Sequence, residues 1–413
     1  MFNSGGHWLT ARRLRAHGLL FALAIWSVYI WTLATPGLRD RNGNLKGTDF
    51  LHFYTIGALA LEHRGADLYN MNVQAVLAAE RVPQAAGISY LPSYPPQVSL
   101  LFAPLAQLSY PAALTVWWSL SAAIYAACCF LVWRTCPNLK NYAWTASIVA
   151  LGFPAFFHLI AWGQTSALAL ACFTAMFLLL ERNRNVLAGI ALGLLIFKPQ
   201  LGLAAAIVFA ASGAWRIIGG AVLGAAMELA AGVLYYGFSP LREWFHTLAG
   251  VDRLFPLLEP KPYQTHCLRT FWAMILPWPW LALVAYAITA VAALVMTAGL
   301  WRRKARASLH LQFSALLLAT VLISPHLTVY DLVVLAPALL LLADWLLACS
   351  VKESSAGPLL YLVYALPLVG PLASWTHVQL SVIAMGALLF VLWKMARTKS
   401  PSGPAGKMEH ATL

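Results

Sequence analysis

The stretch that decides the fold is residues 11–34, ARRLRAHGLLFALAIWSVYIWTLA. Three arginines precede a run from Gly18 to Ala34 that contains no charged side chain. As a helix, such a run can cross the roughly 30 Å hydrocarbon layer of a membrane. It exceeds the roughly 7–15 apolar residues of a signal peptide, and no small-residue cleavage site follows it. We therefore expect a retained first transmembrane helix, with the N-terminus in the cytoplasm.

The rest of the chain repeats this apolar pattern. Of its 413 residues, 61% are hydrophobic and only 10% are charged, whereas soluble proteins carry roughly 25% charged residues. The predicted spans are 18–34, 110–133, 142–160, 165–180, 186–197, 200–214, 217–236, 277–300, 311–323, 331–349, 358–373 and 378–394. The sequence thus predicts an all-α polytopic membrane protein with about twelve transmembrane helices. Residues 1–397 would form one membrane domain, and 398–413 a disordered cytoplasmic tail.

Charge distribution supports this topology. Segments predicted to be cytoplasmic hold 17 of the 27 lysines and arginines, whereas the outer segments hold ten basic residues and nine acids. Almost all of the net charge of +13 then lies on one face, as the positive-inside rule expects. Membrane orientation explains this basic excess, so we expect no nucleic-acid partner and place the C-terminus in the cytoplasm.

Two outer loops are long, about 35–109 and 237–276, and each contains an expected amphipathic helix. In the second loop, apolar residues from Leu241 through Trp244 and Phe255 to Leu258 recur at three- and four-residue spacing. In the first, residues 70–82 place Val73, Val76 and Leu77 opposite Gln74 and Arg81. Such helices lie in the membrane interface. They either seal the loops onto lipid or border a groove that admits a lipid-linked substrate.

Asp49 is the leading candidate for chemistry. It lies in Gly47-Thr48-Asp49-Phe50, shortly after the first span, in a chain with only 14 acidic residues. One interpretation is a helix N-cap. The other is a general base, because the aromatic residues after Asp49 would desolvate its carboxylate and raise its basicity.

Other polar residues are expected at the same outer surface. Gln164 and Tyr94 lie in predicted outer turns, where an amide can bind a sugar hydroxyl or cap a helix. Lys198 falls at a Lys-Pro break between two short spans, where a lysine must snorkel, pair with an acid or bind an anion. His326 and Arg269 extend a basic lining that suits a lipid phosphate. The sequence has no phosphate-binding glycine loop, no metal-ligand spacing among its six cysteines and no carboxylate cluster, so we expect neither metal nor cofactor.

In their order along the chain, these motifs resemble those of glycosyltransferase family 87. The resemblance rests on Asp49-Phe50 through Tyr54, Leu68-Tyr69, Tyr94-Pro95-Pro96, Gly163-Gln164, Ala188-Gly189 with Lys198-Pro199, and Ser324-Pro325-His326. It implies a GT-C fold and a polyprenyl-phosphate sugar donor used at the extracytoplasmic face of the cell membrane. Asp49 would be the base that deprotonates a lipid or glycan acceptor, with inversion at the anomeric carbon.

We infer supporting roles for other residues from charge and sidedness. Lys198 and His326 would hold the leaving phosphate, while Gln164, Tyr94, Tyr54 and Arg269 would contact substrate. The chain has His52 three residues after Asp49, where it would tune the base or contact substrate.

Two other functions remain open at this stage. A transporter or lipid flippase would suit a polytopic chain, although such proteins often show internal repeats, and none is visible here. A non-catalytic partner in envelope biosynthesis would need no converging acid and cations.

Overall fold

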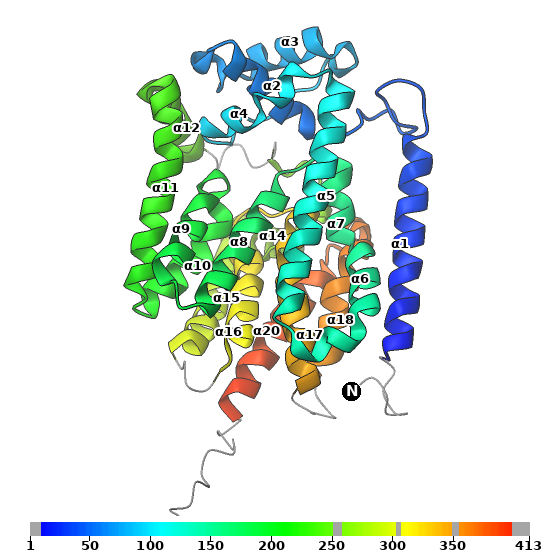
Figure 1. Cartoon of the computed structure of the whole chain (residues 1–413), viewed down its shortest axis with the longest axis vertical. Helices are drawn as coiled ribbons and strands as arrows, with labels where there is room; N and C mark the ends of the chain where they lie inside the picture. The colour runs from blue at the N-terminus through cyan, green and yellow to red at the C-terminus, as the bar shows by residue number, and fades with distance from the viewer. Residues whose placement is uncertain (1–9, 251–257, 303–306, 349–354, 399–413) are drawn as a thin grey trace, which may run out of the picture.

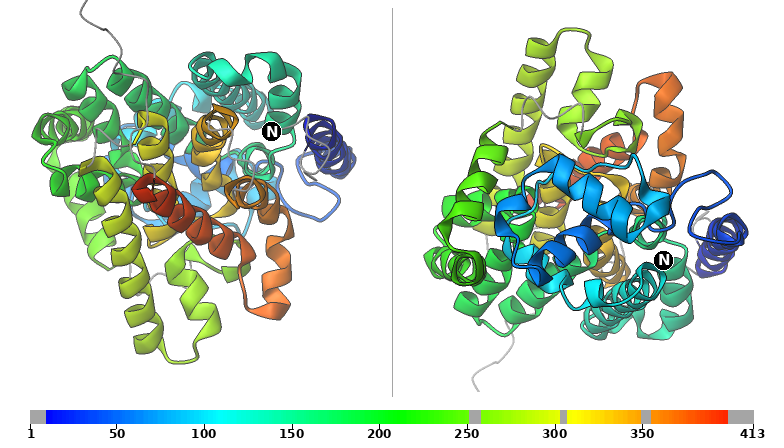
Figure 2. Two further views of the ribbon diagram at one scale, coloured as in Figure 1. Left: turned by 90° about the horizontal axis from the view of Figure 1, so that it is seen from below. Right: turned by 90° about the horizontal axis from the view of Figure 1, so that it is seen from above.

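The computed structural model describes residues 10–250, 258–302, 307–348 and 355–398, and every regular element in these ranges is a helix. Figure 1 shows a bundle of long helices with a smaller helical cap across one end. The cap consists of α2 (Phe50–Leu61), α3 (Met71–Arg81) and α4 (Gln97–Phe102). Seen from above in Figure 2, the cap crosses the middle of the bundle, while α1 (Ala11–Leu33) stands at its edge.

Seven helical segments of the described residues are long and apolar enough to cross a membrane. They are α1, α5 (Tyr110–Arg134), α11 (Trp215–Tyr236), α15 (Pro279–Arg302), η7 with α17 (Val329–Leu335, Ala336–Ala348), α18 to α19 (Ala356–Ala365, Leu366–Leu372, Ala373–Thr376) and α20 (Leu380–Thr398). An eighth is possible where η4 and α6 (Pro137–Tyr142, Ala143–Leu151) join α7 (Pro154–Trp162) at a bend of 45°. These segments make the chain a multi-pass membrane protein.

The expected count of about twelve spans is not confirmed. Four predicted spans correspond to helices of 10–17 residues, which fall short of a full crossing. They are α8 (Ser166–Glu181), α9 with η5 (Asn185–Gly193, Leu194–Phe197), α10 (Pro199–Ala211) and α16 (Leu309–Ile323). Local breaks explain the shortening, because Gly163 adopts φ +67° before α8 and Pro199 begins α10 directly after Lys198.

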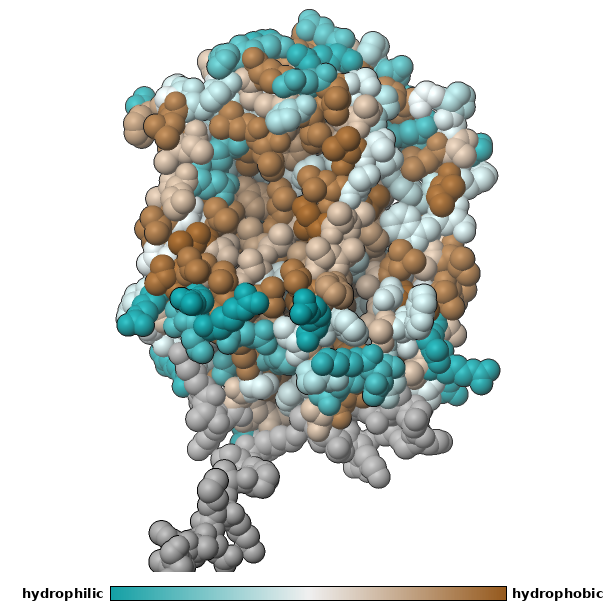
Figure 3. Space-filling model, viewed as in Figure 1, coloured by the Kyte–Doolittle hydropathy of each residue, from teal (hydrophilic) through white to brown (hydrophobic). Residues whose placement is uncertain are grey.

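Glycines let α9 and α11 approach almost backbone to backbone. A Cβ atom at Gly189 would lie 2.1 Å from the carbonyl oxygen of Ile217, and one at Gly220 would lie 2.2 Å from that of Val186. In lipid, where apolar surface gives little drive for helix association, such small-residue contacts hold helices together. Figure 3 shows the apolar side surface of the bundle between more hydrophilic ends, as a membrane-spanning body requires.

The structure confirms a helix in each of the two outer loops and corrects the buried face of the first. In α3 the buried residues include Gln74 and Leu77, whereas Val76 is 58% exposed. Gln74 can be buried because its amide donates to the carbonyl of Leu68 at 2.6 Å.

In α12 (Phe238–Ala249) Trp244 is buried, and its indole nitrogen donates to the carbonyl of Ser93 at 3.0 Å, so this face packs on the cap. Residues 251–257 of the predicted stripe, with Val251 and Phe255, lie outside the described residues, as does the predicted tail beyond Thr398.

Candidate active site

The segment before α2 is bound to the end of α7, and this contact places Asp49. The backbone N–H of Asp49 donates to the carbonyl of Trp162 at 3.0 Å. Gly163 packs so closely on Phe50 that a Cβ there would lie 2.6 Å from the Cβ of Phe50. The indole of Trp117 donates to the carbonyl of Gly163 at 2.9 Å. Only glycine combines this left-handed backbone with such a close approach.

The structure does not support the helix-cap interpretation of Asp49. Asp49 precedes α2, but its side chain makes no capping hydrogen bond to that helix. Its Oδ2 instead accepts a hydrogen bond of 2.6 Å from Nε2 of Gln164. Desolvation raises the pKa of Asp49 from its ordinary 3.8 to about 6, although the Gln164 hydrogen bond and the charge of Lys198 oppose the rise. A carboxylate held by one oxygen with this pKa can accept a proton near neutral pH.

Tyr94 and His52 border the cap side of this carboxylate. The hydroxyl of Tyr94 donates to Oε1 of Gln164 at 3.3 Å, so Tyr94 orients the amide that holds Asp49. The ring of His52 lies 5.8 Å from that of Tyr94, and His52 is only 5% exposed.

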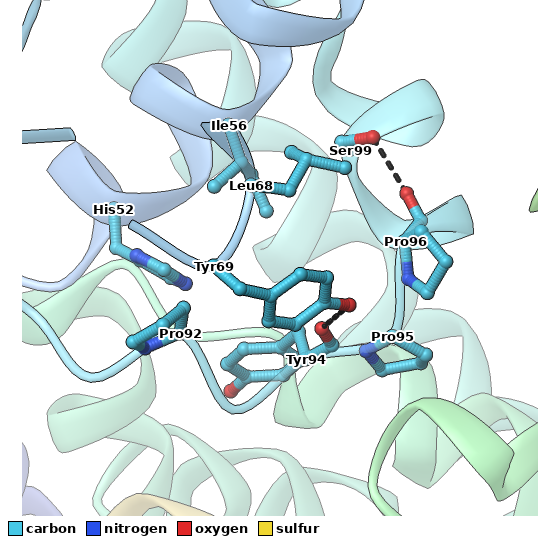
Figure 4. A pocket seen from close by; sticks show the side chains of 9 residues that line it. All are labelled: His52, Ile56, Leu68, Tyr69, Pro92, Tyr94, Pro95, Pro96 and Ser99. Atoms are coloured by element: carbon cyan, nitrogen blue, oxygen red, sulfur yellow. Dashed lines mark hydrogen bonds between the residues drawn. The ribbon is translucent and has the colours of Figure 1, made fainter. Parts of the chain in front are cut away.

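Both rings line a small pocket of about 10 Å³, together with Tyr69, Pro92, Pro95 and Pro96 (Figure 4). Nδ1 of His52 is buried and has no hydrogen-bond partner in the described part of the chain.

Lys198 lies inside the protein at the expected helix break and pairs with an acid. Its Nζ is 2.8 Å from Oδ1 of Asp331 and 2.9 Å from Oγ of Ser166, and the two charged side chains are 4% and 3% exposed. Ser166 also donates to Oδ1 of Asp331 at 2.5 Å. The Nζ of Lys198 stands 5.0 Å from the ring centroid of Tyr330. Lys198 therefore neither snorkels nor stands uncompensated.

Local structure fixes Asp331. It occupies the third position of η7, and its Oδ2 accepts from the backbone and the hydroxyl of Thr328 in a capping box. Oδ2 of Asp331 thus caps the start of η7, while Oδ1 binds Lys198. Both charges of this pair lie near enough to Asp49 to affect its pKa.

His326 and Arg269 gather around a different acid. Nδ1 of His326 lies 2.9 Å from Oε1 of Glu259, and the guanidinium of Arg269 lies 3.7 Å from the same oxygen. Thr270 donates to Oε2 of Glu259 at 2.9 Å. The expectation of one acid opposed by several cations is therefore corrected, since each of the three cations has a carboxylate nearby.

Tyr54 has a packing position. It is 4% exposed, its hydroxyl donates to the carbonyl of Leu108 at 2.8 Å, and its ring contacts that of Tyr110 at 5.4 Å. The expected substrate contact of Tyr54 is therefore not supported by its surroundings.

Sequence reasoning missed Ser166 and Glu259 and gave Asp331 no role. Ser166 directly follows the Gly163-Gln164-Thr165 turn, and Asp331 follows His326 by five residues, so their places next to recognised motifs were the available signal. Lys198 and Asp331, which pair in the structure, lie more than 130 residues apart in the sequence, and no local pattern reveals such a contact.

Comparison with known proteins identifies the family of the chain. The model of glycosyltransferase family 87 matches residues 91–325, which contain Tyr94, Gln164, Lys198 and Arg269 but not Asp49 or His326. No curated protein and no solved structure matches the chain. Because the family model covers more than half of the sequence, this chain belongs to glycosyltransferase family 87.

Proposed function

We propose that this membrane glycosyltransferase moves a hexose, such as mannose, from a polyprenyl-phosphate donor to a lipid or glycan acceptor. The observation that carries the proposal is the part-buried contact between Asp49 and Gln164, at 2.6 Å, where the cap meets the bundle. The cap would face the extracytoplasmic side, since it lies at the end of α1 opposite the arginine-rich start of that helix (Figure 1).

Asp49 would act as the general base. Gln164 occupies Oδ2, and we assign Oδ1 to the acceptor hydroxyl. As Asp49 takes the hydroxyl proton, the acceptor oxygen attacks the anomeric carbon. The bond from that carbon to the phosphate oxygen breaks, and the polyprenyl phosphate leaves with the electron pair. A single displacement inverts the anomeric configuration.

The leaving phosphate would lie on the cationic side of the site, toward Lys198, His326 and Arg269. Positive groups fixed before reaction stabilise developing negative charge without reorganisation. The acids beside them keep these cations in place while the site is empty, because an unpaired buried charge is costly. His52 and Tyr94, on the pocket side, would contact sugar.

Donor class provides the direct test. The purified protein is given radiolabelled mannose as polyprenyl-phosphate mannose or as a nucleotide sugar, with a membrane lipid extract as the acceptor source. Labelled lipid or glycan product is expected from the first donor alone. Transfer from the nucleotide sugar by purified protein would contradict the proposed donor.

Replacing Gln164 tests whether its hydrogen bond orients Asp49 for catalysis. Gln164→Leu removes the donor to Asp49, and we expect kcat to fall about tenfold to a hundredfold because the base is no longer oriented. Gln107→Leu, in an η3 turn of the cap (Leu105–Gln107), is the matched control and should transfer normally.

A further inference from the structure

Glu228 is a carboxylate within a membrane-spanning helix, and the mechanism above does not use it. It lies in α11, seven residues before the apolar and aromatic end of that helix at Tyr235 and Tyr236, and it is partly buried. Ionisable side chains inside transmembrane segments are costly and usually serve a function.

On α11, Gly224 and Gly232 lie one turn before and one turn after Glu228, on the same helix face. Gly220 and Gly224 pack on α9, whereas a Cβ at Gly232 would meet the backbone nitrogen of Gln97 in α4 at 3.1 Å. Glu228 therefore lies between the contact with the bundle and the contact with the cap, where α11 passes from one to the other (Figure 1).

Glu228 and Gln97 form one hydrogen bond, and acceptor oxygens of the pair stay available for further hydrogen bonds. Nε2 of Gln97 donates to Oε1 of Glu228 at 3.1 Å. Gln97 is only 7% exposed, and its Oε1 is buried and has no hydrogen-bond partner among the described residues. A buried amide oxygen without a donor costs free energy. A group that completes this pair donates hydrogen bonds, which a sugar hydroxyl can do and a phosphodiester cannot.

The pair also stands close to the catalytic carboxylate along the chain. Gln97 follows Tyr94-Pro95-Pro96, so the backbone from Tyr94 to Gln97 spans at most about 10 Å. Tyr94 in turn donates to Gln164, which holds Asp49. Asp49–Gln164 and Glu228–Gln97 are thus two carboxylate–amide pairs joined through the Tyr94-Pro95-Pro96 segment.

We propose that Glu228 and Gln97 form a second subsite that binds hydroxyl groups of a glycolipid substrate. This inference rests on the proposed function for the identity of the substrate as a lipid-linked sugar. The subsite positions sugar at the membrane surface, and Asp49 performs the chemistry.

Binding can be measured without transfer. The full chain in phosphatidylcholine nanodiscs is titrated with radiolabelled octyl α-mannoside, with octyl phosphate and octylammonium as competitors. For Glu228→Leu and for Gln97→Met, we expect the Kd for octyl mannoside to rise about tenfold to a hundredfold, as expected from lost hydrogen bonds to a charged group and an amide. The surface control Glu80→Gln should bind the mannoside as wild type does.

Three results would overturn the inference. One is unchanged mannoside binding by both variants. Another is Glu228-dependent binding of octylammonium in place of the mannoside, which would assign the site to an amine. The last is a lower melting temperature of Glu228→Leu together with an unchanged Kd, which would make the pair a helix contact only. Transfer from polyprenyl-phosphate mannose, measured on the same wild-type preparation, separates a failure of the subsite from a failure of the proposed function.

Discussion

Replacing Asp49 by asparagine should abolish transfer and at the same time stabilise the protein. Desolvation raises the pKa of Asp49 by about two units, to about 6, above its ordinary 3.8. Each unit corresponds to 1.36 kcal/mol, so the ionised carboxylate destabilises the folded protein by at most about 3 kcal/mol. Asparagine keeps an oxygen that can accept from Gln164 and has no charge to desolvate.

The sign of the pH dependence follows from the raised pKa. Between about pH 4 and pH 6 the folded protein binds more protons at Asp49 than the unfolded chain does. The penalty is therefore absent below about pH 4 and fully present above about pH 6. The stabilisation of Asp49→Asn over wild type should appear at pH 7.5 and vanish near pH 4.

Two assays on detergent-purified protein check the two effects. Transfer of radiolabelled mannose from polyprenyl-phosphate mannose should fall about a hundredfold to ten-thousandfold, the usual contribution of a general base. The melting temperature of Asp49→Asn at pH 7.5 should equal or exceed that of wild type. Asp67→Asn is the matched control, because Asp67 pairs with Arg64 at the surface of the cap with 31% of its side chain exposed. Near-normal transfer by Asp49→Asn would refute the base, and a large fall in its melting temperature would refute the argument from desolvation.

Three further predictions concern packing, the buried ion pair and pH. Gly220→Leu should lower stability by about 2 kcal/mol or more in thermal unfolding, because its Cβ would meet the carbonyl of Val186, whereas Gly219→Leu on the open face should not. Lys198→Met should lower the free energy of unfolding by about 3–5 kcal/mol, because it leaves the charge of Asp331 without Lys198. If the double variant Lys198→Met/Asp331→Asn lost as much stability as the two single variants together, this pairing would be contradicted. The kcat/KM of wild type should fall about tenfold per pH unit below about 6, as Asp49 becomes protonated, and a flat profile from pH 5 to 7 would contradict the assignment.

Local pattern was sufficient to predict some of the site. Asp49, Gln164, Tyr94 and Lys198 were recognised from their types and from their positions beside helix breaks, and the structure brings them into one region. His326 was recognised as well, but its described partner is Glu259. The partners of these residues could not be predicted, because a hydrogen bond such as Ser166 to Asp331 joins positions 165 residues apart.

The sequence by itself determined that the chain is helical, crosses a membrane and carries a rare acid next to aromatic residues. Composition and run length are sufficient for this, since lipid tolerates only helices or closed barrels and long apolar runs favour helices. Tertiary structure decided how many helices are long enough to cross, which face of α3 is buried and which acid compensates each cation. It also turned Asp49 from a possible helix cap into a carboxylate held by Gln164. That change has a physical reason: the side-chain geometry of Asp49 depends on the contact of Gly163 with Phe50, which forms only when two distant segments pack.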